Sequence, residues 1–230
     1  MTRIALERIR SLTPVIFVLI LMISTIACSG NASLTDTTSL PAISITPTSS
    51  VLPTLTTPSV ISPTVVPLKV IIYTDLQCGA CGKLHFEIEP ELRRLYVSTG
   101  KAEIETRLVG SLGNDSLLAA EAVFCARDQG KSQEYMNALF EAWQNNDTEA
   151  YNIERLVGLS DLLCLDQNAF KRCLDSGIGK AELDRNMSLA NADGIEVLPA
   201  MLVGDNRVEG FKSLDTYIEL IENALINTSD

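Results

Sequence analysis

The chain has 230 residues, of which 46% are hydrophobic and 20% are charged, and its formal net charge is −11 at pH 7. A strongly acidic chain without basic runs is repelled by nucleic acid and by anionic lipid surfaces, which argues against a nucleic-acid partner. Six cysteines against a single histidine point instead to thiol chemistry.

Residues 1–28 have the pattern of an export signal. Arginines precede an uncharged run, Ser11 to Ala27, that is shorter than a comfortable membrane span of about 20 residues. The end of this run resembles a bacterial lipoprotein cleavage box with Cys28 as the lipidated residue, although Thr25 stands where leucine is usual. Whether the signal is lipidated, left as an uncleaved anchor or removed by ordinary secretion, we expect the rest of the chain outside the cytoplasm. A lipid anchor or the N-terminal segment would tether it to the cell membrane.

Residues 29–67 differ sharply in composition. Over half of them are serine, threonine or proline, and Asp36 is the only charged residue. Such a segment cannot build a core and prefers extended, solvated conformations. We therefore predict a disordered linker that holds the following domain away from a membrane.

The domain, predicted over residues 68–230, opens with a strand, a dithiol and a helix. Lys69 to Tyr73 is short, apolar and β-branched, as in a strand buried on both faces. A helix is predicted from the spacing of Leu84, Ile88, Leu92 and Leu95. Cys78 and Cys81 therefore lie at a helix N-terminus, where free N–H groups and the helix dipole stabilise a thiolate. We expect Cys78 to be the exposed, reactive sulfur and Cys81 the buried, resolving one.

Other uses of a CxxC motif fit less well. Cys78, Cys81 and His85 would supply three zinc ligands, but no second CxxC or histidine pair follows. Haem attachment needs a histidine directly after the second cysteine, where this chain has Gly82. A structural disulfide stays possible, but the flanking strand and helix favour redox chemistry. We expect no metal and no cofactor.

The remaining elements alternate between strand and helix patterns. Lys101 to Val109 alternates as a strand does, and Asn114 or Asp115 is a candidate N-cap for the first helix of a helical block. The residues Leu117–Phe124 open this first helix, which Gly130 breaks, and Tyr135–Trp143 mark the second. Further helices are predicted over Ile153–Leu165, Gln167–Leu174 and about Lys180–Ala192. The end of the domain is predicted as strand Gly194–Gly204, short strand Arg207–Glu209 and helix Leu214–Leu225.

This order resembles an α/β, thioredoxin-like fold with an inserted helical subdomain at about residues 114–192. Three stretches are similar to the DsbA-like family of extracytoplasmic thiol–disulfide oxidoreductases. They are Tyr73–Cys81 for the active-site entry, Ala119–Phe140 for the helical insertion, and Gly194–Gly204 for a cis-proline loop.

The resemblance implies roles for further residues. Pro199 would follow a cis peptide bond, and the Leu198 backbone would pair with an extended substrate. Cys125 and Cys173 would form a structural disulfide and leave Cys164 free, with Cys164–Cys173 as the rival pairing. We interpret His85 as a helix-surface residue.

The resemblance also implies a function. The chain would oxidise thiols of exported or partly folded proteins and be reoxidised by a quinone-linked membrane partner. Strongly oxidising relatives commonly have Pro-His between the cysteines, so Gly79-Ala80 predicts a milder oxidant. Leu198 replaces the usual valine or threonine. The alternatives are a disulfide reductase or isomerase of the same fold, or a non-catalytic metal- or peptide-binding module.

Overall fold

The computed structural model describes residues 66–227, which all belong to one unit, Ile61–Asp230. The predicted export signal at residues 1–28, with Cys28, and nearly all of the predicted linker lie outside the described residues. Within residues 66–227, no helix has both the length and the apolar character needed to cross a membrane.

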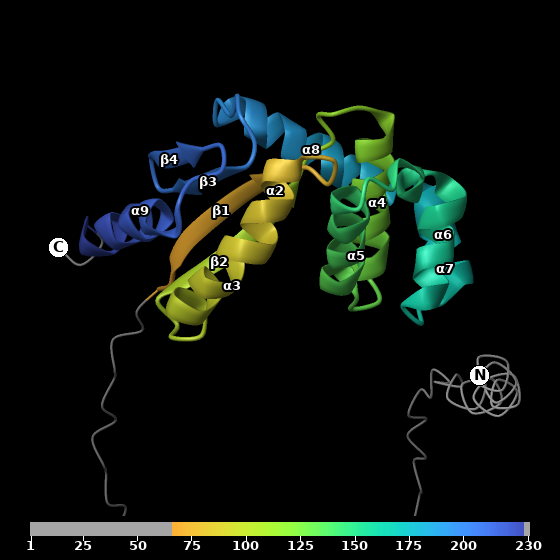
Figure 1. Ribbon diagram of the computed structural model, residues 1–230, viewed down its shortest axis with the longest axis horizontal. Helices are drawn as coiled ribbons and strands as arrows, with labels where there is room; N and C mark the ends of the chain where they lie inside the picture. Colours follow the sequence, from red (N-terminus) through yellow and green to blue (C-terminus); the bar gives the residue numbers. More distant parts are fainter. Residues whose placement is uncertain (1–65, 228–230) are drawn as a thin grey trace, which may run out of the picture. The chain divides into compact units, whose positions relative to one another are not determined.

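A four-stranded sheet forms the centre of the domain (Figure 1). Its strands are β1 (Leu68–Thr74), β2 (Ala102–Leu108), β3 (Ala200–Val203) and β4 (Asn206–Glu209), in the order β2-β1-β3-β4. β1 pairs in parallel with β2 and antiparallel with β3. Because β1 has a partner on each side and helices on both faces, its side chains Val70, Ile72 and Tyr73 are fully buried.

A continuous helical run follows β1 and covers one face of the sheet. It consists of α2 (Gly79–Lys83), the π-helical η1 (Leu84–Ile88), α3 (Glu89–Leu92) and the π-helical η2 (Arg93–Val97). Together with α9 (Leu214–Asn227), its buried residues pack on Val70 and Ile72 of β1 and on Met201 and Val203 of β3. The π turns are not visible in the hydrophobic spacing, which predicts one regular helix.

A helical insertion follows β2; in Figure 1 its green and cyan helices lie to one side of the sheet, and its last helix, in blue, runs back across the sheet. It contains α4 (Asn114–Arg127), α5 (Ser132–Gln144), the 3-10 helix η3 (Thr148–Tyr151), α6 (Ile153–Leu162), α7 (Gln167–Ser176) and α8 (Ile178–Ala192). Ala190 of α8 packs with Tyr73 and Leu202 on the face of the sheet opposite α9. The sheet therefore lies between two helical layers.

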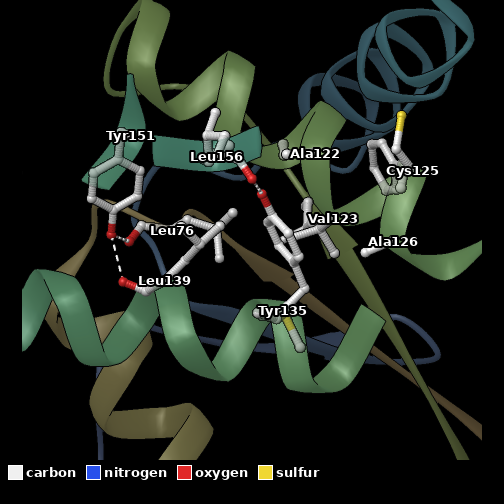
Figure 2. Packing of buried hydrophobic residues seen from close by; sticks show 14 of the residues in the cluster. Leu76, Ala122, Val123, Cys125, Ala126, Tyr135, Leu139, Tyr151 and Leu156 are labelled. Atoms are coloured by element: carbon white, nitrogen blue, oxygen red, sulfur yellow. Dashed lines mark hydrogen bonds between the residues drawn. The ribbon is translucent and has the colours of Figure 1, made fainter. Parts of the chain in front are cut away.

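Two buried tyrosines tie the insertion together (Figure 2). The Tyr135 hydroxyl donates to the Leu156 carbonyl at 2.6 Å. The Tyr151 hydroxyl lies 2.8 Å from the carbonyl of Leu139 and 3.0 Å from that of Leu76. Since Leu76 lies between β1 and the dithiol, Tyr151 joins the insertion to the segment that carries the cysteines.

Two local predictions are wrong. α4 begins at Asn114 itself, after Gly113, and neither Asn114 nor Asp115 caps it with a side chain. The strand predicted over Gly194–Gly204 forms only over Ala200–Val203, because the chain before Pro199 is a loop.

Candidate active site

The dithiol lies where β1 ends and α2 begins (Figure 1). Cys78 is the N-cap residue of α2, and a disulfide joins it to Cys81 with the two Cα atoms 5.1 Å apart. Cys78 is partly exposed, whereas Cys81 is fully buried. The backbone N–H of Cys81 donates to Cys78 Sγ at 3.1 Å. That donor would also stabilise a Cys78 thiolate once the disulfide is reduced.

Asp75 anchors the turn that enters the dithiol, and the sequence analysis did not identify it. Its side chain is fully buried. Its Oδ1 accepts hydrogen bonds from Gln77 N at 2.9 Å and Ser116 Oγ at 2.5 Å. Its Oδ2 accepts from Ser111 N at 2.8 Å and Leu112 N at 3.2 Å. One carboxylate therefore fixes the active-site turn against the loop after β2 and the first turn of α4.

The cis-proline loop reaches the same end of the sheet. The Leu198–Pro199 peptide is cis. Ala200 pairs with Tyr73 near the end of β1, so Pro199 lies beside that end of the strand. Cys78 follows the same end of β1 after a short turn. Leu198 and Cys78 also pack against one buried cluster, which includes Cys81. The fold thus brings the four residues predicted for the dithiol and the proline loop into one region.

An open hollow of about 610 Å³ lies beside the dithiol. Its lining comes from the exposed side of the active-site helix, from α5 and from the segment after β4. The residues are Gly79, Ala80, Lys83, Glu87, Trp143, Gln144 and Phe211. A partner chain that approaches Cys78 would meet aromatic and charged groups together there.

His85 is buried, so its interpretation as a helix-surface residue is wrong. It is 5% exposed because α5 covers this side of the helical run. Its Nε2 lies 2.7 Å from Asn137 Oδ1, and its Nδ1 lies 3.7 Å from Glu89 Oε1. The Glu89 carboxylate is also paired with Arg93 at 3.3 Å. His85, the third residue of the zinc alternative, therefore contacts Asn137 of α5.

We predict that His85 makes stability depend on pH. Burial lowers the pKa of His85, but the interactions with Glu89 and Asn137 outweigh burial and raise that pKa above its ordinary value of 6.5. A pKa raised by folding means that protonated His85 stabilises the fold, and this contribution is lost as the pH rises through the folded-state pKa. The melting temperature should therefore fall from about pH 6 to about pH 8.

In His85→Gln, which keeps a polar group toward Asn137, this part of the pH dependence should disappear. Thermal unfolding of both proteins across the pH series checks it. Parallel curves for the two proteins would show that His85 does not titrate in this range.

A second disulfide joins Cys125 of α4 to Cys173 of α7, with the Cα atoms 5.7 Å apart. This is the pairing that the resemblance implied, and Cys164 does not take part in it. Cys164 is also disulfide-bonded, so the expectation that it is free is wrong. Cys28, the predicted lipidation site, is not among the described residues.

Comparison with known proteins gives consistent matches. A family model described as thioredoxin matches residues 57–223. The probable disulfide bond formation protein D of Bacillus anthracis is 26% identical over 146 residues, which are 61% of this chain and 66% of that protein. The match therefore spans slightly less than two thirds of that relative's length. A protein of the same name from Bacillus cereus is 27% identical over 145 residues, 61% of this chain and 67% of that protein.

Solved structures show the same fold. Oxidised BdbD from Bacillus subtilis has a TM-score of 0.62 at 21% identity, covering 70% of this chain and 88% of that one. Alpha-DsbA1 from Wolbachia pipientis has a TM-score of 0.60 at 22% identity, covering 71% and 90%. The expected α/β, thioredoxin-like fold with a helical insertion is thereby confirmed.

Proposed function

Since the chain belongs to the thioredoxin family, whose model spans residues 57–223, we propose that it is a thiol–disulfide oxidoreductase that oxidises exported proteins. The observation that carries this proposal is the disulfide at the start of α2, with Cys78 partly exposed and Cys81 buried. The names of the Bacillus relatives, which call them probable disulfide bond formation proteins, support it.

The proposed reaction exchanges one disulfide for another. A substrate thiolate attacks Cys78 Sγ, the Cys78–Cys81 bond breaks, and Cys81 leaves as a thiolate that takes up a proton. A second substrate thiolate then attacks the substrate sulfur of the mixed disulfide, and Cys78 leaves as the thiolate. The substrate loses two electrons and two protons; the dithiol gains both electrons, Cys81 takes up one proton, and the other proton is released to solvent because Cys78 leaves as the thiolate. The exchange needs no cofactor.

The surroundings of Cys78 support these steps. The Cys81 N–H aimed at Cys78 Sγ stabilises the leaving thiolate in the second step. In this proposal Leu198 and Pro199 bind the substrate backbone, and the hollow beside Gly79 and Ala80 receives its side chains. Asp75 fixes the turn that carries Cys78 and does not meet the substrate.

The proposal also covers the substrates, the redox partner and the location of the chain in the cell. Substrates would be exported or partly folded proteins with free thiols, and a quinone-linked membrane partner would reoxidise the dithiol. The chain would be extracytoplasmic and tethered by a lipid on Cys28 or by its N-terminal segment. Incorporation of a labelled fatty acid into the wild-type chain and its absence from Cys28→Ala would support the lipid anchor.

A reductase or isomerase is the second candidate, favoured by Ala80 at a position where a histidine would stabilise the thiolate. The reduction potential of the Cys78–Cys81 pair separates the two, measured by equilibration with glutathione buffers. A value near about −120 mV, that of DsbA, supports an oxidase, and one near about −270 mV, that of thioredoxin, supports a reductase. Because Cys125, Cys173 and Cys164 are also disulfide-bonded, the Cys78→Ala/Cys81→Ala variant is equilibrated in parallel and its signal is subtracted, so that only the active-site pair is followed.

We predict that Ala80→His makes the dithiol more oxidising. A histidine beside Cys78 stabilises the thiolate of the reduced form, which raises the reduction potential. A tenfold shift in the exchange equilibrium corresponds to about 30 mV, and we expect a rise of that order or more. The same equilibration checks it, with Ala80→Gln as the uncharged control. An equal potential in both variants would contradict the electrostatic explanation.

A further inference from the structure

The loop before the cis peptide is held from one side by β4. Arg207 Nη1 donates to the carbonyl of Asp193, where α8 ends, at 2.7 Å. The backbone N–H of Gly210 donates to the Pro199 carbonyl at 2.8 Å. These two bonds hold the two ends of the loop. A third contact holds its middle, at Glu196 and Val197.

That third contact is the carboxylate of Glu209, the last residue of β4. Its Oε2 accepts hydrogen bonds from Val197 N at 2.8 Å and from Glu196 N at 3.2 Å. Its Oε1 lies 2.9 Å from Arg207 Nε, so the ion pair orients the carboxylate toward the loop. The Glu209 side chain is 19% exposed, which reduces competition from water for these N–H groups.

Leu198 is the next residue along this loop, and its backbone N–H and carbonyl are available for hydrogen bonds. Among residues 66–227, no hydrogen bond is formed by its N–H or by its carbonyl. Glu209 takes the two N–H groups before Leu198, and the β3–β4 ladder begins after Pro199 at Ala200. One residue with an unpaired backbone donor and acceptor thus lies between two fixed segments.

We propose that Glu209 is a positioning residue for substrate binding. Its carboxylate holds the backbone at Glu196 and Val197, so that Leu198 presents its N–H and carbonyl in the geometry needed by an extended substrate chain. An extended peptide pairs with such groups as an added strand does. The proposal rests on the proposed oxidoreductase function, because it concerns the substrate of that reaction. Glu209 touches neither sulfur and does not alter their chemistry.

The test compares two kinds of thiol substrate. We expect Glu209→Ala to raise the KM for a reduced, two-cysteine peptide about tenfold and to change kcat less than twofold, because weakening a substrate hydrogen bond that is equal in the ground and transition states raises KM alone. The rate with dithiothreitol, which has no peptide backbone, and the reduction potential should stay the same. Glu209→Gln keeps one oxygen for the two loop N–H groups but turns an amide NH2 toward Arg207 Nε, so we expect a KM between those of wild type and Glu209→Ala. Asp205→Ala, which removes an exposed acid from the adjacent turn, is the matched control.

The outcomes separate the two proposals. A wild-type chain that reacts with dithiothreitol but not with peptide thiols would overturn the proposed function. An active wild type whose KM is unchanged in Glu209→Ala would overturn the role of Glu209 alone. So would a lower melting temperature without a change in KM. If Glu209→Ala does not fold, Glu209→Asp replaces it in the test. Aspartate keeps the charge but is one methylene too short to reach both N–H groups. An unchanged KM in Glu209→Asp would then overturn the proposal.

Discussion

Replacing Cys78 by serine is expected to abolish disulfide transfer to a reduced protein. Cys78 is the partly exposed sulfur of the pair and the one whose Sγ accepts the Cys81 N–H. A serine hydroxyl neither forms a disulfide nor leaves as a stable anion, so no parallel route remains. We expect the transfer rate to fall at least about 1,000-fold, to the uncatalysed level. The rate is measured by mixing a reduced test protein with one equivalent of wild type or variant in the absence of oxygen and following the loss of thiols in the test protein.

The partner variant Cys81→Ser provides the control. It also loses oxidation, because it cannot hold the disulfide, but its Cys78 thiolate can still attack a disulfide-containing substrate. With no thiol at position 81 to resolve the complex, a mixed disulfide should accumulate as a larger band on a non-reducing gel. Cys78→Ser should give no such band. A band from Cys78→Ser instead would reverse the roles of the two cysteines.

The sequence predicted those parts of the site that local signals define. A β-branched run, a CxxC and a helical repeat lie within residues 69–95, so the position of Cys78 and Cys81 at a helix start could be predicted without tertiary information. The burial of Cys81 followed from the same helical spacing, one turn after Cys78. The cis bond before Pro199 came only from family resemblance, since a cis peptide has no local signal strong enough to predict it.

The errors occur where one element covers another. His85 is polar and lies between apolar positions, which favours a surface position until α5 is placed over it. Asp75 and Glu209 were missed for a related reason. Asp75 accepts hydrogen bonds from residues 36 and 41 positions away, and Glu209 binds a loop 12 positions away. Contacts at such separations depend on the tertiary arrangement of the fold, and no periodicity in the sequence indicates them.

Removing the second disulfide should cost stability and leave the chemistry intact. Cys125 and Cys173 are 48 positions apart, and loop-closure entropy for that length corresponds to about 4 kcal/mol of unfolding free energy. For a domain of this size the melting temperature of Cys125→Ala/Cys173→Ala should fall by roughly 10 °C. At 25 °C, transfer by the folded variant should equal that of wild type, because neither sulfur belongs to the Cys78 site.

Cys78→Ala/Cys81→Ala is the matched control for this experiment. It also removes two cysteines, but they are only 3 positions apart, so the loop-closure contribution is far smaller, about 2 kcal/mol. We therefore expect Cys125→Ala/Cys173→Ala to lose more stability but no activity, and Cys78→Ala/Cys81→Ala to lose less stability but all activity. The opposite combination, an unchanged melting temperature with impaired transfer in Cys125→Ala/Cys173→Ala, would mean that the Cys125–Cys173 bond takes part in electron transfer. In that case the helical insertion would be a second redox site joined to the first.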